Sequence, residues 1–80
     1  MSNLESWKRQ LESYKNHLES TKNSKAGAIK RIDELIKNST DPSNKKRYRE
    51  EKQRLKEHWD AQIRQIKKNI DSHKFYKPKN

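Results

Sequence analysis

The chain of 80 residues has no cysteine, one glycine and two prolines, and these absences exclude several kinds of protein. Without cysteine there is no disulfide framework, no thiolate nucleophile and no zinc site built on thiolates. A single glycine excludes a glycine-rich loop of the kind that cradles phosphate groups. Because the prolines stand only at Pro42 and Pro78, long stretches contain no strong helix breaker.

Apolar residues are also scarce, since 26% of the chain is hydrophobic and 40% is charged. A domain this small and polar has a thin core, and such domains often depend on a partner for stability. No stretch approaches the roughly 18 apolar residues of a membrane span, and the first residues lack the apolar segment of a signal peptide. We therefore expect one small cytoplasmic domain without a membrane span.

Two stretches carry apolar residues at the 3- and 4-residue spacing of a helical stripe. The first stripe contains Leu4, Trp7, Leu11, Tyr14 and Leu18, and it resumes at Ile29, Ile32 and Ile36. The second stripe contains Tyr48, Leu55, Trp59, Ile63, Ile66 and Ile70. Residues 38–42 (Asn-Ser-Thr-Asp-Pro) form a turn that ends in a helix start. The pattern predicts a helix over about 3–37, a turn over 38–41, a helix over about 42–72 and a flexible basic tail over 73–80.

Ser2 and Glu5 have the spacing of a capping box at the start of the first helix. The segment from Ser20 to Gly27 contains weaker helix formers, so a break near Asn23 and Ser24 that would give three helices is the alternative. One continuous helix is favoured because the stripe keeps its phase through Lys25.

A short turn between two long helices predicts an all-α fold, an antiparallel two-helix hairpin with coiled-coil-like packing, all in one domain. Residues whose numbers sum to about 84 then lie opposite each other, which places Trp59 opposite Lys25 and Trp7 near Phe75 and Tyr76. The residues expected to pack the helices or meet a partner are Trp7, Leu11, Tyr14, Leu18, Ile29, Ile32, Leu55, Trp59, Ile63, Ile66 and Ile70. Since a two-helix hairpin covers each stripe on one side only, we expect a dimer or a helical bundle.

No arrangement of residues predicts catalysis, and we expect a protein that is not an enzyme. The three histidines are far apart in sequence and are expected on different faces, which gives no metal site. Neighbouring carboxylates stand among bases at helical spacing, as in surface ion pairs. We expect no metal, no cofactor and no small-molecule substrate. The first hypothesis for function is therefore a small non-enzymatic helical interaction protein, an adaptor or regulator that acts through self-association or a helical protein partner.

Basic residues support a second hypothesis, a nucleic-acid-binding hairpin. The net charge is +10, and residues 41–80 hold 13 basic and 6 acidic side chains against 8 and 5 in residues 1–40. A cationic stripe releases counterions when it neutralises phosphates. The candidate residues are Lys45, Lys46, Arg47, Arg49, Lys52, Lys56, Arg64 and Lys67. The competing interpretation is a solvated lysine-rich surface, because acidic residues interrupt the stripe.

In size and shape the expected hairpin resembles the small helical-hairpin substrates and partners of Gram-positive type VII secretion. That resemblance implies a secreted protein or a secretion partner as a third hypothesis. The W-x-G turn of those proteins is missing here, since Trp7 and Trp59 lie within the expected helices and the turn falls at residues 38–42. No residue role carries across.

Overall fold

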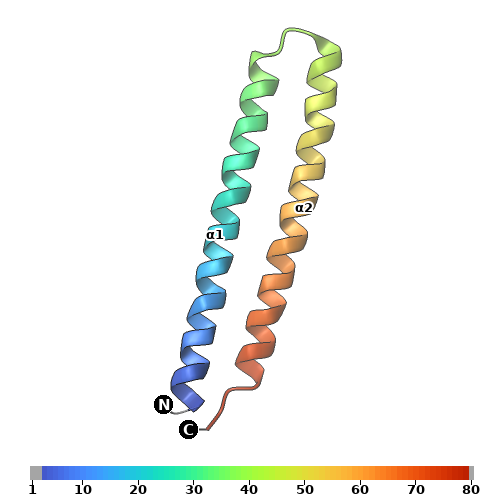
Figure 1. Ribbon diagram of the computed structural model, residues 1–80. Coiled ribbons are helices and arrows are strands. Elements are labelled where there is room, and N and C mark those ends of the chain that lie inside the picture. Colours follow the sequence, from blue (N-terminus) through green and yellow to red (C-terminus); the bar gives the residue numbers. More distant parts are fainter. Residues whose placement is uncertain (1–2, 80) are drawn as a thin grey trace.

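The computed structural model describes residues 3–79, which form two antiparallel helices joined by a short turn (Figure 1). Helix α1 spans Asn3–Asn38 and helix α2 spans Pro42–Phe75. No strand occurs in the part of the chain that is described. The predicted all-α helical hairpin is therefore confirmed. Ser2, the expected N-terminal cap, lies outside the described residues.

Helix α1 runs without interruption through the weak segment around Gly27, so the three-helix alternative is wrong. Thr21 lies in this segment with its hydroxyl donating to the backbone carbonyl of His17 over 2.7 Å, which satisfies a polar side chain inside the seam. Gly27 itself is exposed, and nothing lies within 4 Å of the position a Cβ would occupy. The glycine is thus tolerated in the helix without any packing requirement for it.

The turn between the helices begins with the Ser39 N–H donating to the Leu35 carbonyl over 3.1 Å. Asp41 then has extended backbone angles and accepts a hydrogen bond from the Ser43 N–H over 2.9 Å. Pro42 follows at the first helical position, where its missing N–H has no cost. Capping chemistry that is visible in the sequence therefore starts α2.

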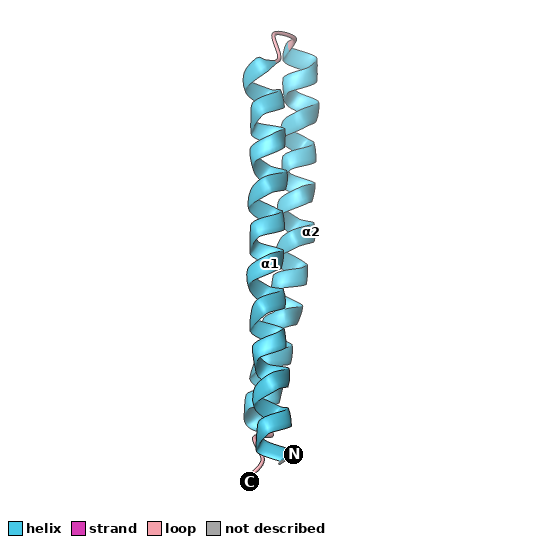
Figure 2. Ribbon diagram, turned by 60° about the vertical axis from the view of Figure 1, so that its left-hand side comes forward, coloured by secondary structure: helices cyan, strands magenta, loops and turns pink. Residues whose placement is uncertain are grey.

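The two helices lie side by side along their whole length, as Figures 1 and 2 show from two directions. The Cα trace measures 61 × 16 × 10 Å, so the protein is a thin rod with no room for a thick core. Its buried apolar residues are Ala28, Ile32, Ile66 and Ile70, and none of the larger side chains in residues 3–79 is fully buried. The remaining predicted packing residues are half-buried: Trp7, Leu11, Tyr14, Leu18, Ile29, Leu55, Trp59 and Ile63.

Two buried seam residues, Thr21 and Ala28, are missing from the predicted packing set. Counting by 3 and 4 from Leu18 leads to Thr21, Lys25, Ala28 and Ile32, so a hydroxyl, an ammonium and a methyl group fill the middle of the α1 seam. Trp59 stands within one residue of the level of Lys25, since Lys25 is paired with Asp60. It lines a hollow together with Ser20, Ser24 and Gly27 of α1.

The predicted register is accurate to one residue through the middle and turn half of the hairpin. Ion pairs join Lys25 to Asp60 and Asp33 to Lys52, and both pairs of residue numbers sum to 85 where 84 was predicted. At the open end the prediction is wrong, because Trp7 packs on His73 and those numbers sum to 80.

Trp7 and His73 close the open end of the hairpin. Their rings stack with centroids 5.1 Å apart and planes within 8°. The Trp7 indole N–H donates to the His73 carbonyl over 2.7 Å, and His73 Nε2 lies 2.8 Å from the Trp7 carbonyl. These contacts hold α2 together through Phe75, beyond its expected end at 72. Phe75 and Tyr76, the residues expected near Trp7, are 81% and 76% exposed.

Candidate functional site

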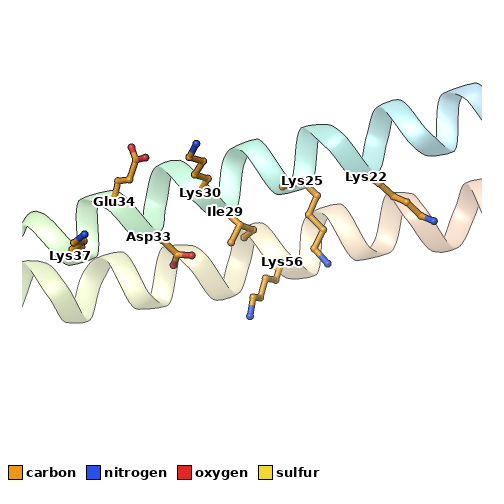
Figure 3. A pocket seen from close by; sticks show the side chains of 9 residues that line it. Lys22, Lys25, Ile29, Lys30, Asp33, Glu34, Lys37 and Lys56 are labelled. Carbon is orange, nitrogen blue, oxygen red and sulfur yellow. The ribbon is translucent and has the colours of Figure 1, made fainter.

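Grooves run along both sides of the line where the helices meet, and the two sides differ in charge. On one side lies a groove that we name the basic groove (Figure 3). It is lined by Lys22, Lys25, Ala26, Ile29, Lys30, Asp33, Glu34, Lys37 and Lys56. In Figure 3 the side chains of Lys25 and Asp33 point toward α2, whereas Lys30 and Glu34 point away from it. The groove therefore has a small apolar floor, with lysines and two carboxylates of α1 on one side and Lys56 of α2 on the other.

Both carboxylates near the floor of the basic groove are paired across the seam. Lys25 Nζ lies 2.6 Å from Asp60 Oδ1, and Lys52 Nζ lies 2.6 Å from Asp33 Oδ1. The hydrogen bond from Lys25, together with its charge, lowers the pKa of Asp60 below its ordinary value, with smaller contributions from the charges of Arg64 and Lys56. These side chains are partly exposed, so each ion pair adds little stability. Their effect is to neutralise Asp60 and Asp33 with two lysines that belong to the seam, whereas Glu34 of the groove points away from α2.

The predicted nucleic-acid-binding residues are divided among several faces of α2. Lys56 lines the basic groove, and Arg49 and Lys67 lie on the same side of the helix, since they are 7 and 11 residues from it. Lys45 and Lys52 are half-buried at the seam.

The other three candidates on α2 are exposed elsewhere. Arg47 lies on the opposite side of the hairpin, with its guanidinium 5.9 Å from the Tyr48 ring centroid and hydrogen-bonded to Asn44. Lys46 and Arg64 stand on the outer face of α2, away from α1, as their helical phase places them. The eight candidates therefore do not share one surface, although Lys45, Arg49, Lys52 and Lys56, at spacings of 4, 3 and 4 residues, lie on one side of α2.

The lysines of α1 are the part of this surface that the sequence prediction missed. Lys22, Lys30 and Lys37 line the basic groove opposite Lys56. A signal for them exists, because Lys8, Lys15 and Lys22 recur every seven residues and therefore share one side of α1. Which side of α1 meets which side of α2 cannot be read from either helix alone.

On the other side of the seam, near the turn, lies a groove that we name the apolar groove. It is lined by Ala28, Arg31, Ile32, Leu35, Arg47, Tyr48, Glu51 and Leu55. Leu35 is 48% exposed and lies in this groove beside Ile32, Tyr48 and Leu55. Toward the open end the same side continues as a groove without charged residues, lined by Tyr14, His17, His58, Ala61, Gln62, Gln65, Ile66 and Asn69.

The sequence analysis expected the three histidines on different faces, but two of them share a groove. His17 and His58 both line the uncharged groove and are exposed. His73 is half-buried between Trp7 and Tyr14, with its ring 5.5 Å from the Tyr14 ring in an edge contact. Across residues 3–79 no group of three or more histidines and carboxylates is close enough to hold a metal ion.

Comparisons of the chain with protein-family models, with curated proteins and with solved structures find no match. Neither helix, over the residues described, is long and apolar enough to cross a membrane. Arguments about function therefore rest on the surfaces of the hairpin itself.

Proposed function

We propose that this protein is a small non-enzymatic helical interaction protein, an adaptor or regulator, and that it pairs with a second copy of itself through the side that carries the apolar groove. Two hairpins joined in this way make a four-helix bundle. The observation that carries the proposal is the apolar groove, where Leu35 stands half exposed beside Ile32, Tyr48 and Leu55.

Incomplete burial of the apolar residues favours binding of a second chain to the side that carries the apolar groove. In a two-helix hairpin each apolar stripe has only one neighbour, and here the larger apolar residues of the seam remain half-buried. Covering such residues stabilises a protein by ~25 cal/mol for each Å² of apolar surface removed from water. The broad side of the hairpin measures 61 by 16 Å, roughly 1,000 Å², against the ~800 Å² per partner of a stable interface.

Charge favours the same side. Each copy carries a formal charge of +10, so two copies repel each other wherever their basic surfaces meet. The apolar groove has only Arg31, Arg47 and Glu51 at its rim, and the groove that continues it has no charged residue. Depletion of charge at the centre is a feature of protein interfaces. Pairing through this side leaves both basic grooves facing outward.

The test is the oligomeric state of wild-type protein and of Leu35→Gln, measured by sedimentation velocity over a dilution series. We expect the wild type to be a dimer that dissociates on dilution. Leu35→Gln should shift the equilibrium toward monomer by about tenfold or more, because a buried interface leucine is replaced by a polar amide.

Ala26→Gln is the matched control, since Ala26 is also exposed on α1 but lies in the basic groove. This variant should dimerise as the wild type does. A wild type that stays monomeric at every concentration contradicts self-association. A dimer that loses affinity equally in both variants contradicts the assignment to the apolar groove.

A further inference from the structure

We propose that the basic side of the hairpin binds the phosphate backbone of double-stranded nucleic acid without reading its sequence. The basic side comprises six exposed residues, three from each helix: Lys15, Lys22, Lys37, Arg49, Lys56 and Lys67. Lys22, Lys37 and Lys56 line the basic groove directly, and Figure 3 shows Lys22 and Lys56 on either side of it. This surface is separate from the side proposed for self-association.

None of these six cations is occupied by an ion pair. Among residues 3–79 the ion pairs within 4 Å are Lys25 with Asp60 and Lys52 with Asp33. Lys25 and Lys52 neutralise Asp60 and Asp33 from within the seam, so these two carboxylates form no ion pair with the outer cations. A surface that gathers unpaired like charges destabilises the free protein, and a polyanion removes that cost.

The spacing of the cations suits a rigid linear polyanion. At ~1.5 Å of rise per residue, Lys15 and Lys22 are separated by ~10 Å along α1, and Arg49 and Lys56 by the same distance along α2. From Lys15 to Lys37 the cations extend over ~33 Å, about half the length of a rod 61 Å long. Duplex nucleic acid presents one negative charge per ~1.7 Å of its axis, so phosphates lie within reach of every cation in both rows.

The lining of the groove distinguishes a duplex from other anionic partners. Single strands are usually held by aromatic side chains that stack on the bases, and no aromatic residue lines the basic groove. Anionic membranes are bound by helices that insert an apolar face, and here the floor offers only Ala26 and Ile29. A surface of charge with little else fits contact with a phosphate backbone.

The experiment compares two variants of the full chain that carry the same net charge, +8. Lys22→Gln with Lys56→Gln removes one cation per helix from the basic side. Arg31→Gln with Arg47→Gln removes one cation per helix from the rim of the apolar groove. Binding to a labelled DNA duplex of about 20 base pairs is measured by fluorescence anisotropy across a salt series for wild type and both variants.

We expect the wild type to bind at low salt with a steep salt dependence. Lys22→Gln with Lys56→Gln should reduce the slope of log K against log salt by about two and weaken binding about tenfold or more. Arg31→Gln with Arg47→Gln should leave the slope within half a unit of the wild type. Circular dichroism of each variant shows that both remain helical, and sedimentation shows that the oligomeric state is unchanged by the first pair.

Three outcomes overturn the proposal. One is a wild type that does not bind the duplex at low salt. Another is an equal loss in both double variants, which means that net charge acts without a site. The third is preferential binding to single-stranded RNA or to phosphatidylserine vesicles that depends on Lys22 and Lys56, which assigns the basic side to another anion. Since self-association has its own readout, its failure leaves this result interpretable.

Discussion

The contact between Trp7 and His73 joins the two helices at the open end of the hairpin, as the turn joins them at the other end. The two rings stack, and polar bonds run in both directions between side chain and backbone. Because the Trp7 carbonyl can only accept, His73 Nε2 must carry a hydrogen and donate it. His73, which the sequence pattern placed in a flexible tail, is therefore part of the fold.

His73→Ala should lower the free energy of unfolding by about 1–3 kcal/mol, because an aromatic contact and a hydrogen bond each contribute about 0.5–1.5 kcal/mol. Urea unfolding followed by tryptophan fluorescence measures the loss. Phe75→Ala is the control, since its ring is 81% exposed and its removal should change the urea midpoint little. Similar losses in both variants would mean that Phe75 closes this end in solution.

The ion pair of Asp60 makes the stability of the hairpin depend on pH in the acid range. Its pKa is lowered from 3.8 in the folded state, chiefly by the hydrogen bond from Lys25. Folding therefore favours the ionised carboxylate. The stability that this carboxylate adds is fully present above its unfolded pKa and is lost as pH falls through its folded pKa.

Asp60→Asn should be less stable than the wild type near neutral pH, and the difference should close as pH falls below 3.8 and through the lowered pKa of the folded carboxyl. Urea midpoints at a series of pH values measure it. Asp71→Asn, at an exposed position on α2, serves as the control. A difference between wild type and Asp60→Asn that persists unchanged at the lowest pH would show that the carboxylate acts through its shape rather than its charge.

At the scale of helices, local chemistry in the sequence was enough to predict α1, the turn and α2. The stripe spacing, the Asp41 cap and Pro42 each act within a few residues. The sequence was less informative about the middle of the seam, because Thr21 and Ala28 are buried there although neither is a large apolar residue. The stripe of large apolar residues does not include Thr21, whose hydroxyl donates to the carbonyl of His17 one turn earlier.

Gly27 gives a prediction that belongs to α1 as a helix. Its Cβ position is open, so Gly27→Ala should raise the free energy of unfolding by about 1 kcal/mol, the difference in helix propensity between the two residues. The neighbouring change Ala26→Gly, also at an exposed position, should lower it by a similar amount. Thermal unfolding followed by circular dichroism measures both. A neutral or destabilising Gly27→Ala would indicate that α1 needs its weak point.

For the whole molecule, the informative property is the difference between its two sides. The sequence prediction placed the cationic candidates on α2 alone, whereas the hairpin places Arg47 at the apolar groove and brings Lys22 and Lys37 of α1 beside Lys56. Which residues share a side depends on how the two helices are rotated about their axes, and long-range packing decides that rotation. The predicted packing residues are all buried or half-buried, because apolar side chains face the neighbouring helix whatever the rotation of the charged residues.

Lys52 and Lys56 stand one turn apart on α2, and the structure gives them opposite effects on stability. Lys52 is paired with Asp33 across the seam, whereas Lys56 lines the basic groove without an ion pair in residues 3–79. Lys52→Gln should lower the free energy of unfolding by up to ~1 kcal/mol, the usual limit for a partly exposed pair. Lys56→Gln should raise it by a few tenths of a kcal/mol (~0.2–0.5) at low salt, because the repulsion that it relieves within the basic side outweighs the lost attraction to Asp60.

Each of these substitutions changes the net charge from +10 to +9, so a bulk effect of charge predicts the same sign for both. Urea unfolding at low and at physiological salt separates the two explanations. The gain in Lys56→Gln should fade as salt screens the repulsion over a Debye length of ~8 Å. The loss in Lys52→Gln should shrink as well but keep its sign, because the close, partly exposed pair with Asp33 is only partly screened. Equal shifts in the free energy of unfolding of the two variants would contradict the prediction, because the seam lysine and the basic-side lysine would then be energetically alike.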